Sequence, residues 1–132
     1  DVSDPANPVH KGVIYDGKGS APYLAGAWGL VVEGGYAYVT SIDSKALEII
    51  DISNPSDPKH KGSLFDGEGN APYLGYPVSI FKSGNVAYIG NVGAANTGQF
   101  EIVDISNPSL PTHKGALTLG NNQALGQTSP YG

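Results

Sequence analysis

The chain has 132 residues, a length typical of one domain, with 19 Gly, 10 Pro, 14% charged residues and 39% hydrophobic residues. This composition is too apolar for a disordered chain and too rich in turn formers for a helical bundle. The absence of cysteine excludes disulfides, thiolate zinc sites and cysteine nucleophiles. The net charge is −5 and no arginine is present, which argues against nucleic-acid binding, and no apolar run approaches the ~20 residues of a membrane span.

Short motifs recur along the chain, first after 50 residues and then after 53. The pentapeptide Asp1-Val-Ser-Asp-Pro5 returns as Asp-Ile-Ser-Asn-Pro at 51–55 and at 104–108. The tripeptide His-Lys-Gly stands at 10–12, 60–62 and 113–115, and the segment Asp-Gly-x-Gly-x-Ala-Pro-Tyr-Leu stands at 16–24 and 66–74. A period of this length indicates a repeat architecture in which each unit is one supersecondary structure.

Each unit is expected to contain four short strands and no helix. Residues 78–82 alternate between apolar and polar, residues 85–89 are rich in β-branched and aromatic side chains, and the Asn-Pro pair at 107–108 ends a strand because proline cannot donate to a ladder. The expected strands are 28–33, 36–42, 46–52, 60–65, 78–82, 85–89, 100–105 and 113–117, with a ninth beginning at His10.

Four-stranded units that repeat every ~50 residues are typical of a β-propeller, in which twisted antiparallel sheets, called blades, stack around an axis. We therefore expect an all-β chain of propeller-type four-stranded antiparallel blades, about two and a quarter repeats long. Residues 1–132 are interpreted as part of a single repeat domain. Its parts are the fourth strand and link of a preceding blade (1–27), two blades (28–77 and 78–130) and the start of another blade (131–132).

A family resemblance lies in the third strand of each unit and the turn that follows it. Leu47-Glu-Ile-Ile-Asp-Ile-Ser-Asn-Pro55 and Phe100-Glu-Ile-Val-Asp-Ile-Ser-Asn-Pro108 each follow a strand with the sequence Ala-Tyr-Val or Ala-Tyr-Ile. The pattern resembles the LVIVD repeat family of bacterial and archaeal surface-associated propellers. The resemblance implies an extracellular or envelope β-propeller, and it carries over no catalytic residue and no cofactor. The long segment with Asp-Gly-x-Gly and Ala-Pro-Tyr-Leu is a departure from the shorter repeat of that family.

The histidines and the recurring aspartates are expected to be structural, because a catalytic site is normally one asymmetric cluster and these residues recur in each unit. His10, His60 and His113 each begin a fourth strand, where a His-Lys pair protects an exposed sheet edge. Asp51 and Asp104 end a third strand, where a carboxylate accepts hydrogen bonds from turn N–H groups. We expect no catalytic residue.

The Asp-Gly-x-Gly segments bear a faint likeness to calcium loops. Calcium takes six to eight oxygen ligands, whereas the first loop offers only Asp16 and the second offers Asp66 and Glu68. A glycine-rich turn is the interpretation we favour, and no metal site is predicted.

The long connections are expected to emerge together at one side of the blades. In an antiparallel blade, the turn between strands two and three leaves at the same end as the link to the next blade, and functional residues concentrate on such loops. The residues on this side that suit protein or sugar contact are Tyr23, Trp28, Tyr73, Tyr76, Asn96, Thr97 and Gln99. Because Tyr23 and Tyr73 recur, structural contact between blades is the role we favour for these two residues, and ligand contact is the alternative.

Three functions are consistent with the sequence. The first is a non-enzymatic extracellular or cell-surface scaffold, an adhesin or a self-assembling protein. The second is a glycan-binding propeller module with aromatic stacking platforms, and the third is a lyase or hydrolase built on the loops. About two units would leave two apolar sheet faces open, so the expected partners are other blades or copies of the chain, with a protein or glycan ligand as a further possibility. The chain is either an excerpt of a longer propeller or a unit that stacks on itself, and stacking without closure would give a filament.

Overall fold

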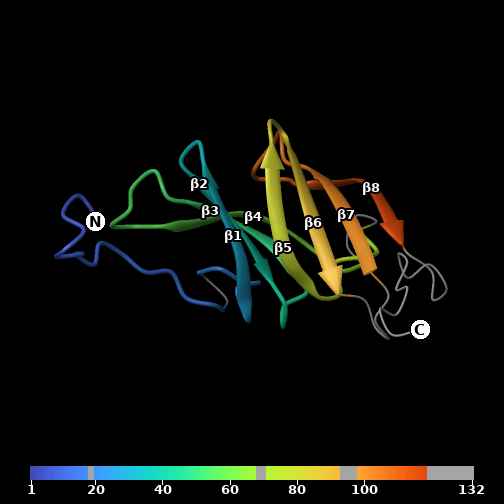
Figure 1. Cartoon of the computed structure of the whole chain (residues 1–132), viewed down its shortest axis with the longest axis horizontal. Coiled ribbons are helices and arrows are strands. Elements are labelled where there is room, and N and C mark those ends of the chain that lie inside the picture. Colours follow the sequence, from blue (N-terminus) through green and yellow to red (C-terminus); the bar gives the residue numbers. More distant parts are fainter. Residues whose placement is uncertain (18–19, 68–70, 93–97, 119–132) are drawn as a thin grey trace, which may run out of the picture.

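The computed structural model describes residues 1–17, 20–67, 71–92 and 98–118 and shows two four-stranded antiparallel sheets with the strand orders β1-β2-β3-β4 and β5-β6-β7-β8 (Figure 1). The all-β architecture and the four-stranded blades are confirmed, and the two sheets do not close into a ring. The strands are β1 (Ala27–Glu33), β2 (Tyr36–Ser41), β3 (Ala46–Asp51), β4 (Lys59–Phe65), β5 (Pro77–Ser83), β6 (Val86–Val92), β7 (Gly98–Asp104) and β8 (Thr112–Thr118).

The turns that join the strands follow from their residues. Gly34 and Gly35 both have positive φ, 61° and 80°, which is the backbone of the two-residue hairpin turn that matches strand twist. Each sheet has a register shift in its first strand, between Ala27 and Gly29 in one and between Pro77 and Ser79 in the other. The two sheets are therefore copies of one unit, down to their irregularities.

The expected ninth strand is wrong for the part of the chain that the structure describes, which contains eight strands. Residues 9–15 are extended but form no ladder, because no third strand is present there for them to pair with. They belong to the N-terminal arm, defined as residues 1–15, which projects from the first sheet beyond β4 (Figure 1). The assignment of residues 1–27 to a preceding blade stays a prediction.

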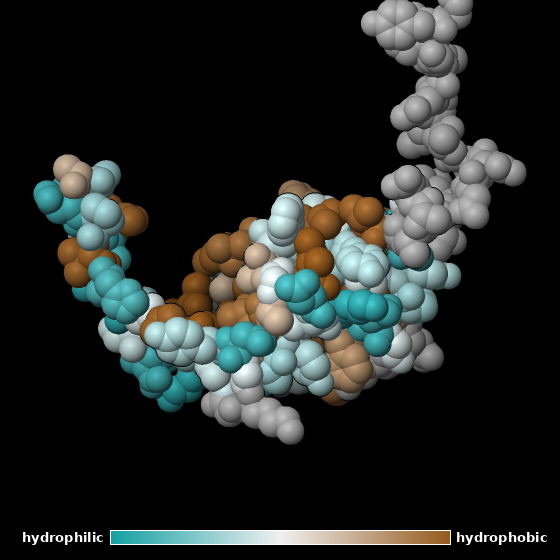
Figure 2. Space-filling model, turned by 90° about the horizontal axis from the view of Figure 1, so that it is seen from below, coloured by the Kyte–Doolittle hydropathy of each residue, from teal (hydrophilic) through white to brown (hydrophobic). Residues whose placement is uncertain are grey.

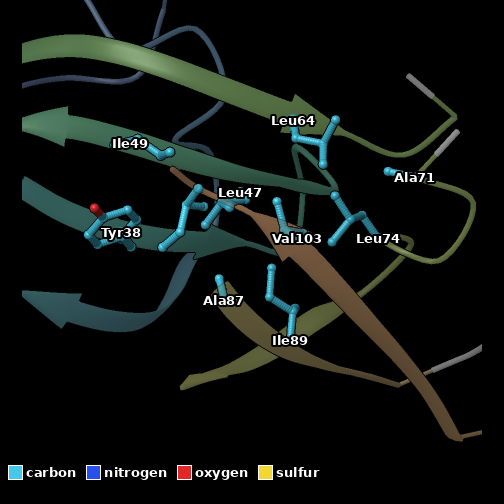
Figure 3. Packing of buried hydrophobic residues seen from close by; sticks show 10 residues of the cluster. Tyr38, Leu47, Ile49, Leu64, Ala71, Leu74, Ala87, Ile89 and Val103 are labelled. Atoms are coloured by element: carbon cyan, nitrogen blue, oxygen red, sulfur yellow. The ribbon is translucent and has the colours of Figure 1, made fainter. Parts of the chain in front are cut away.

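The main core lies between the two sheets (Figure 3). Leu47 and Ile49 of β3 have no exposed surface and meet Ile89 of β6 and Val103 of β7, which are equally buried. Leu74, from the link between the sheets, fills the side of the same cluster and is fully buried. Burial of each such side chain contributes about 1.5–3 kcal/mol, so this cluster is what holds the two blades together.

A polar contact closes the same interface on the side where β5 packs against β1 and β2. The Nζ atom of Lys82 lies 2.9 Å from Glu33 Oε1 and 5.7 Å from the centre of the Tyr38 ring. The Lys82 side chain is only 9% exposed, whereas that of Glu33 is 57% exposed. The ammonium group is thus covered by the neighbouring sheet and neutralised at its edge.

The outer part of the interface depends on a close backbone approach. A Cβ atom at Gly62 of β4 would lie 2.4 Å from the carbonyl oxygen of Pro108, in the turn after β7. The arm repeats this contact on the first sheet, because a Cβ atom at Gly12 would lie 2.3 Å from the carbonyl oxygen of Pro55. Only glycine fits at either position, which explains why His-Lys-Gly recurs in register with the Asn-Pro turn.

Candidate functional site

The first sheet turns one apolar face away from the second sheet. We call it the N-side face, and it consists of Trp28, Leu30, Val32, Ala37, Val39 and Ile50. Leu30 is 62% exposed and Val32 is 58% exposed, while Ile14 of the arm and Leu24 of the link cover the other half of this face. Figure 2 shows the resulting hollow, lined by apolar surface, between the N-terminal arm and the body of the molecule.

The second sheet has an open face on its far side. We call it the C-side face, and it consists of Ser79, Phe81, Ser83, Tyr88, Phe100, Ile102, Gly115 and Leu117. Three aromatic rings form its centre: the Tyr88 ring lies 6.4 Å from that of Phe81 and 6.1 Å from that of Phe100, measured between centroids. Phe81 is 66% exposed. The face is therefore a shallow aromatic groove between exposed strands.

Each sheet also contains a buried glutamate paired with a histidine. Glu48 of β3 and Glu101 of β7 have no exposed surface, and their Oε1 atoms accept hydrogen bonds from Nδ1 of His60 and His113 respectively. The other carboxylate oxygen of each glutamate is buried without a well-formed hydrogen bond to any described residue. The histidines were expected to be exposed edge residues, and His10 and His60 are exposed, whereas His113 is partly covered. The pairing of His60 and His113 with a buried glutamate was not expected.

The position of the two glutamates under the links explains their electrostatics. Burial raises the pKa of Glu48 and of Glu101, while the neighbouring histidine and the backbone N–H of Tyr23 or Tyr73 act in the opposite direction. A signal for the pair was present in the sequence, since Glu and His recur twelve residues apart in both units. Alternating polarity alone could not reveal it, because the polar side of the third strand is covered by the link.

The recurring aspartates occupy the turns that were predicted for them. Oδ1 of Asp51 accepts hydrogen bonds from both the backbone N–H and the hydroxyl of Ser53, at 3.0 and 2.6 Å. Oδ1 of Asp104 accepts the backbone N–H of Ser106 at 2.9 Å. Bonds to Ser106, followed by the bond to Lys114, lower the pKa of Asp104 to about 2. These carboxylates hold the turns that dock against the glycines of the neighbouring unit.

The predicted aromatic contacts are placed at several points of the long-loop side. The Tyr23 ring lies 4.9 Å from that of Phe65 and is half-buried, and Tyr73 is half-buried in the following link. Tyr76 is 45% exposed, and Lys45 Nζ lies 5.5 Å above its ring. Backbone hydrogen bonds hold the links and the turns between strands two and three on the same side of the sheets. One of them joins Ser44 N–H to Ala25 C=O at 3.2 Å.

The remaining predicted residues are divided between the N-side face, a strand and undescribed segments. Trp28 is 69% exposed and belongs to the N-side face, and Gln99 is half-buried in β7 opposite Asn91. Asn96 and Thr97 lie outside the described residues. The predicted contact residues that the structure describes therefore do not form one cluster.

The weak calcium candidates are likewise scattered over the links. Asp16 Oδ1 accepts the backbone N–H of Leu24 at 2.9 Å, and Asp66 donates its own backbone N–H to Lys45 C=O at 2.9 Å. Glu68 lies outside the described residues. Within the described ranges, no group of three or more acidic or histidine side chains is placed to hold a metal ion. Those ranges also hold no helix able to cross a membrane.

Comparison with known proteins identifies a family model that matches the chain in two places. A family model described as the LVIVD repeat matches residues 25–66 and 75–118, so that each match covers one sheet and the end of the link before it. The resemblance seen in the sequence is thereby confirmed. No curated protein and no solved structure matches the chain.

Proposed function

Because this chain belongs to the LVIVD repeat family, we propose that it is a non-enzymatic scaffold, located outside the cell or on its surface, that works by stacking its sheets against further sheets of the same kind. The repeat scaffold follows from the family match and from the two copies of one four-stranded unit. The assembly, the location and the absence of catalysis are the proposal.

Repetition supports a structural role for the groups that could carry chemistry. A buried glutamate that contacts a histidine occurs once in each sheet, as Glu48 with His60 and as Glu101 with His113, and the aspartate turns recur in the same way. Each group has a partner within its own unit that accounts for its position. The acidic composition is compatible with a location outside the cell.

The observation that carries the proposal is the pair of open apolar faces at opposite ends of the molecule. A four-stranded sheet with two apolar faces needs a neighbour on each side, and among the residues that the structure describes each sheet packs against one other sheet. Large exposed apolar patches on soluble proteins mark interaction sites.

Sedimentation velocity over a range of micromolar concentrations tests this function. We expect species larger than the 13.6 kDa chain, whose share grows with concentration. A folded, cooperative monomer at every concentration would contradict the proposal, and binding of a glycan library by such a monomer would favour the glycan-binding alternative instead.

A further inference from the structure

We infer that a second copy of this chain docks head to tail, with its N-side face on the C-side face of the first copy and its turn at residues 51–58 against Gly115. The inference rests on the proposed function and specifies which surfaces meet. Three features of the open faces, compared with the interface inside the chain, support it.

The first feature is continuity with the interface that the chain already contains. Position by position, the N-side face repeats the side of the second sheet that packs on the first: Leu30 corresponds to Ile80, Val39 to Ile89 and Ile50 to Val103. The C-side face likewise repeats the side of the first sheet that packs on the second. The N-side face of one copy therefore fits the C-side face of another as β5–β8 fit β1–β4.

The second feature is the charge pattern of the two open faces. Inside the chain, Lys82 meets Glu33 across the interface. At the open faces the position of Lys82 is taken by Val32, and that of Glu33 is taken by Ser83. Both charges are absent together, so docking the two faces buries no unpaired ion, which would be costly.

The corresponding aromatic contact is complementary as well. Lys82 lies over the Tyr38 ring inside the chain. In the docked pair, Val32 of one copy would lie over Tyr88 of the other, which places an apolar side chain on an aromatic face.

The third feature is an empty position beside Gly115. Gly12 and Gly62 each lie so close to a proline carbonyl that a Cβ atom would collide with it, at 2.3 and 2.4 Å. Gly115 occupies the same place in the third His-Lys-Gly, yet a Cβ atom there would have no described neighbour within 4 Å. The site is shaped for an Asn-Pro turn, and the turn that would arrive with the N-side face is that of Pro55.

Docking requires the arm of the second copy to move aside. Residues 9–15 hold the place beside β1–β4 that β4 holds beside β5–β8, so β8 of the first copy would claim the same position. The arm has no strand hydrogen bonds, whereas β8 is paired along its length with β7. We therefore expect the arm of the second copy to leave this position. Gly115 of the first copy then takes the place of Gly12 beside Pro55 of the second copy.

The Gly115→Ala variant tests the contact between Gly115 and the Pro55 turn of a second copy, and we expect it to leave the fold of the monomer intact. The added methyl group meets no described residue within 4 Å, so the melting temperature should match that of the wild type. In the docked pair it would collide with a carbonyl oxygen, and we expect the dissociation constant measured by sedimentation to rise at least tenfold. Gly75→Ala is the matched control, because a Cβ atom there also meets nothing within 4 Å and Gly75 lies on neither open face.

Charge placement tests the pairing of the faces. Val32→Lys and Ser83→Glu should each weaken association at least tenfold on their own, because each sets an unpaired charge in the docked interface. An equimolar mixture of the two variants should recover association to within about threefold of the wild type, because head-to-tail docking allows two mixed contacts. One mixed contact carries no substitution, and the other joins the lysine to the glutamate as in the pair formed by Lys82 and Glu33.

The outcomes separate the two proposals. A wild-type chain that stays monomeric overturns the proposed assembly and this inference together. A wild-type chain that associates while Gly115→Ala associates equally well, or while mixing restores nothing, overturns the docking mode and leaves the assembly standing.

Discussion

The interface between the sheets and the two open faces are built from the same repeat, yet they differ in burial and in charge. Leu64 is 2% exposed inside the interface, whereas Leu117, its counterpart on β8, is 61% exposed. The interface carries an ion pair at Lys82 and Glu33, and the open faces carry Val32 and Ser83 instead. Corresponding side chains are thus buried where a neighbouring sheet covers them and exposed where none does. The open faces have the composition of a core but are not covered by a described sheet.

The largest difference should appear when equivalent core residues are truncated. Leu47→Ala empties a fully buried position between the sheets and should lower the free energy of unfolding by about 2–5 kcal/mol. Phe100→Ala removes the counterpart on the C-side face, which is 37% exposed, and should cost less in the dissociated chain. Denaturant unfolding at low protein concentration measures the free energy of unfolding of both variants. Equal losses would contradict the difference proposed between the interface and the open face.

A second pair of variants compares the glycines of the two strands that end each sheet. Gly62→Ala forces a methyl group onto the Pro108 carbonyl and should destabilise the chain by about 1–3 kcal/mol. Gly115→Ala should change the stability of the monomer by less than about 0.5 kcal/mol, as other unconstrained surface substitutions do. Thermal melts of the two variants decide the matter; a Gly62→Ala chain as stable as the wild type would show that the close approach is not rigid.

The buried glutamate inside the interface should make stability depend on pH. Burial raises the pKa of Glu101 above its ordinary value of 4.5, so between these two values the folded chain binds more protons than the unfolded chain. The free energy of unfolding then falls as the pH rises through that interval. Relative to Glu101→Gln, the wild type should therefore gain stability as the pH is lowered towards 4.5.

Urea unfolding at a series of pH values measures this difference, with Glu33→Gln as the control at an exposed carboxylate. A wild-type stability that, relative to Glu101→Gln, stays constant or falls as the pH is lowered towards 4.5 would contradict the assignment of burial as the dominant cause.

The smallest effect is expected at the ion pair. Lys82→Met keeps the packing of the aliphatic stem and removes a charge that pairs with an exposed carboxylate, so stability should fall by about 0–1 kcal/mol. Val32→Met, at the corresponding position of the open face, should leave the monomer unchanged. A loss well above this range for Lys82→Met would mean that the pair is a main element of the interface.

The sequence was sufficient to predict the four-stranded unit, because alternating polarity, tight glycine turns and Asn-Pro ends are local signals. It also predicted the aspartate turns at Asp51 and Asp104, whose hydrogen bonds span only two residues. The strand expected at His10 does not form, since a strand needs a ladder partner that local sequence does not supply.

The elements that were missed depend on contacts between distant residues. Glu48 and Glu101 are fully buried and contact a histidine of the next strand, and no role was predicted for these glutamates from the sequence. The pairing of Lys82 with Glu33 was equally invisible, because it joins residues of different sheets. The residues predicted to contact a protein or sugar were grouped only because their loops leave the blades on one side. Side-chain packing instead places Trp28 on the N-side face and Tyr23 against Phe65.

Disulfide trapping tests the head-to-tail contact most directly, because the chain has no cysteine of its own. Inside the chain, a Cβ atom at Gly29 would lie 3.4 Å from Ile80 Cγ2, and the corresponding residues of the open faces are Ser79 and Leu30. The two residues are thus in direct contact across the interface, and a disulfide joins neighbouring residues whose Cβ atoms lie about 3.5–4.5 Å apart. We predict that an oxidised mixture of Leu30→Cys and Ser79→Cys chains gives a cross-linked pair containing one chain of each kind. Cross-linking of Leu30→Cys chains to each other with equal yield, or no mixed product, would contradict head-to-tail docking.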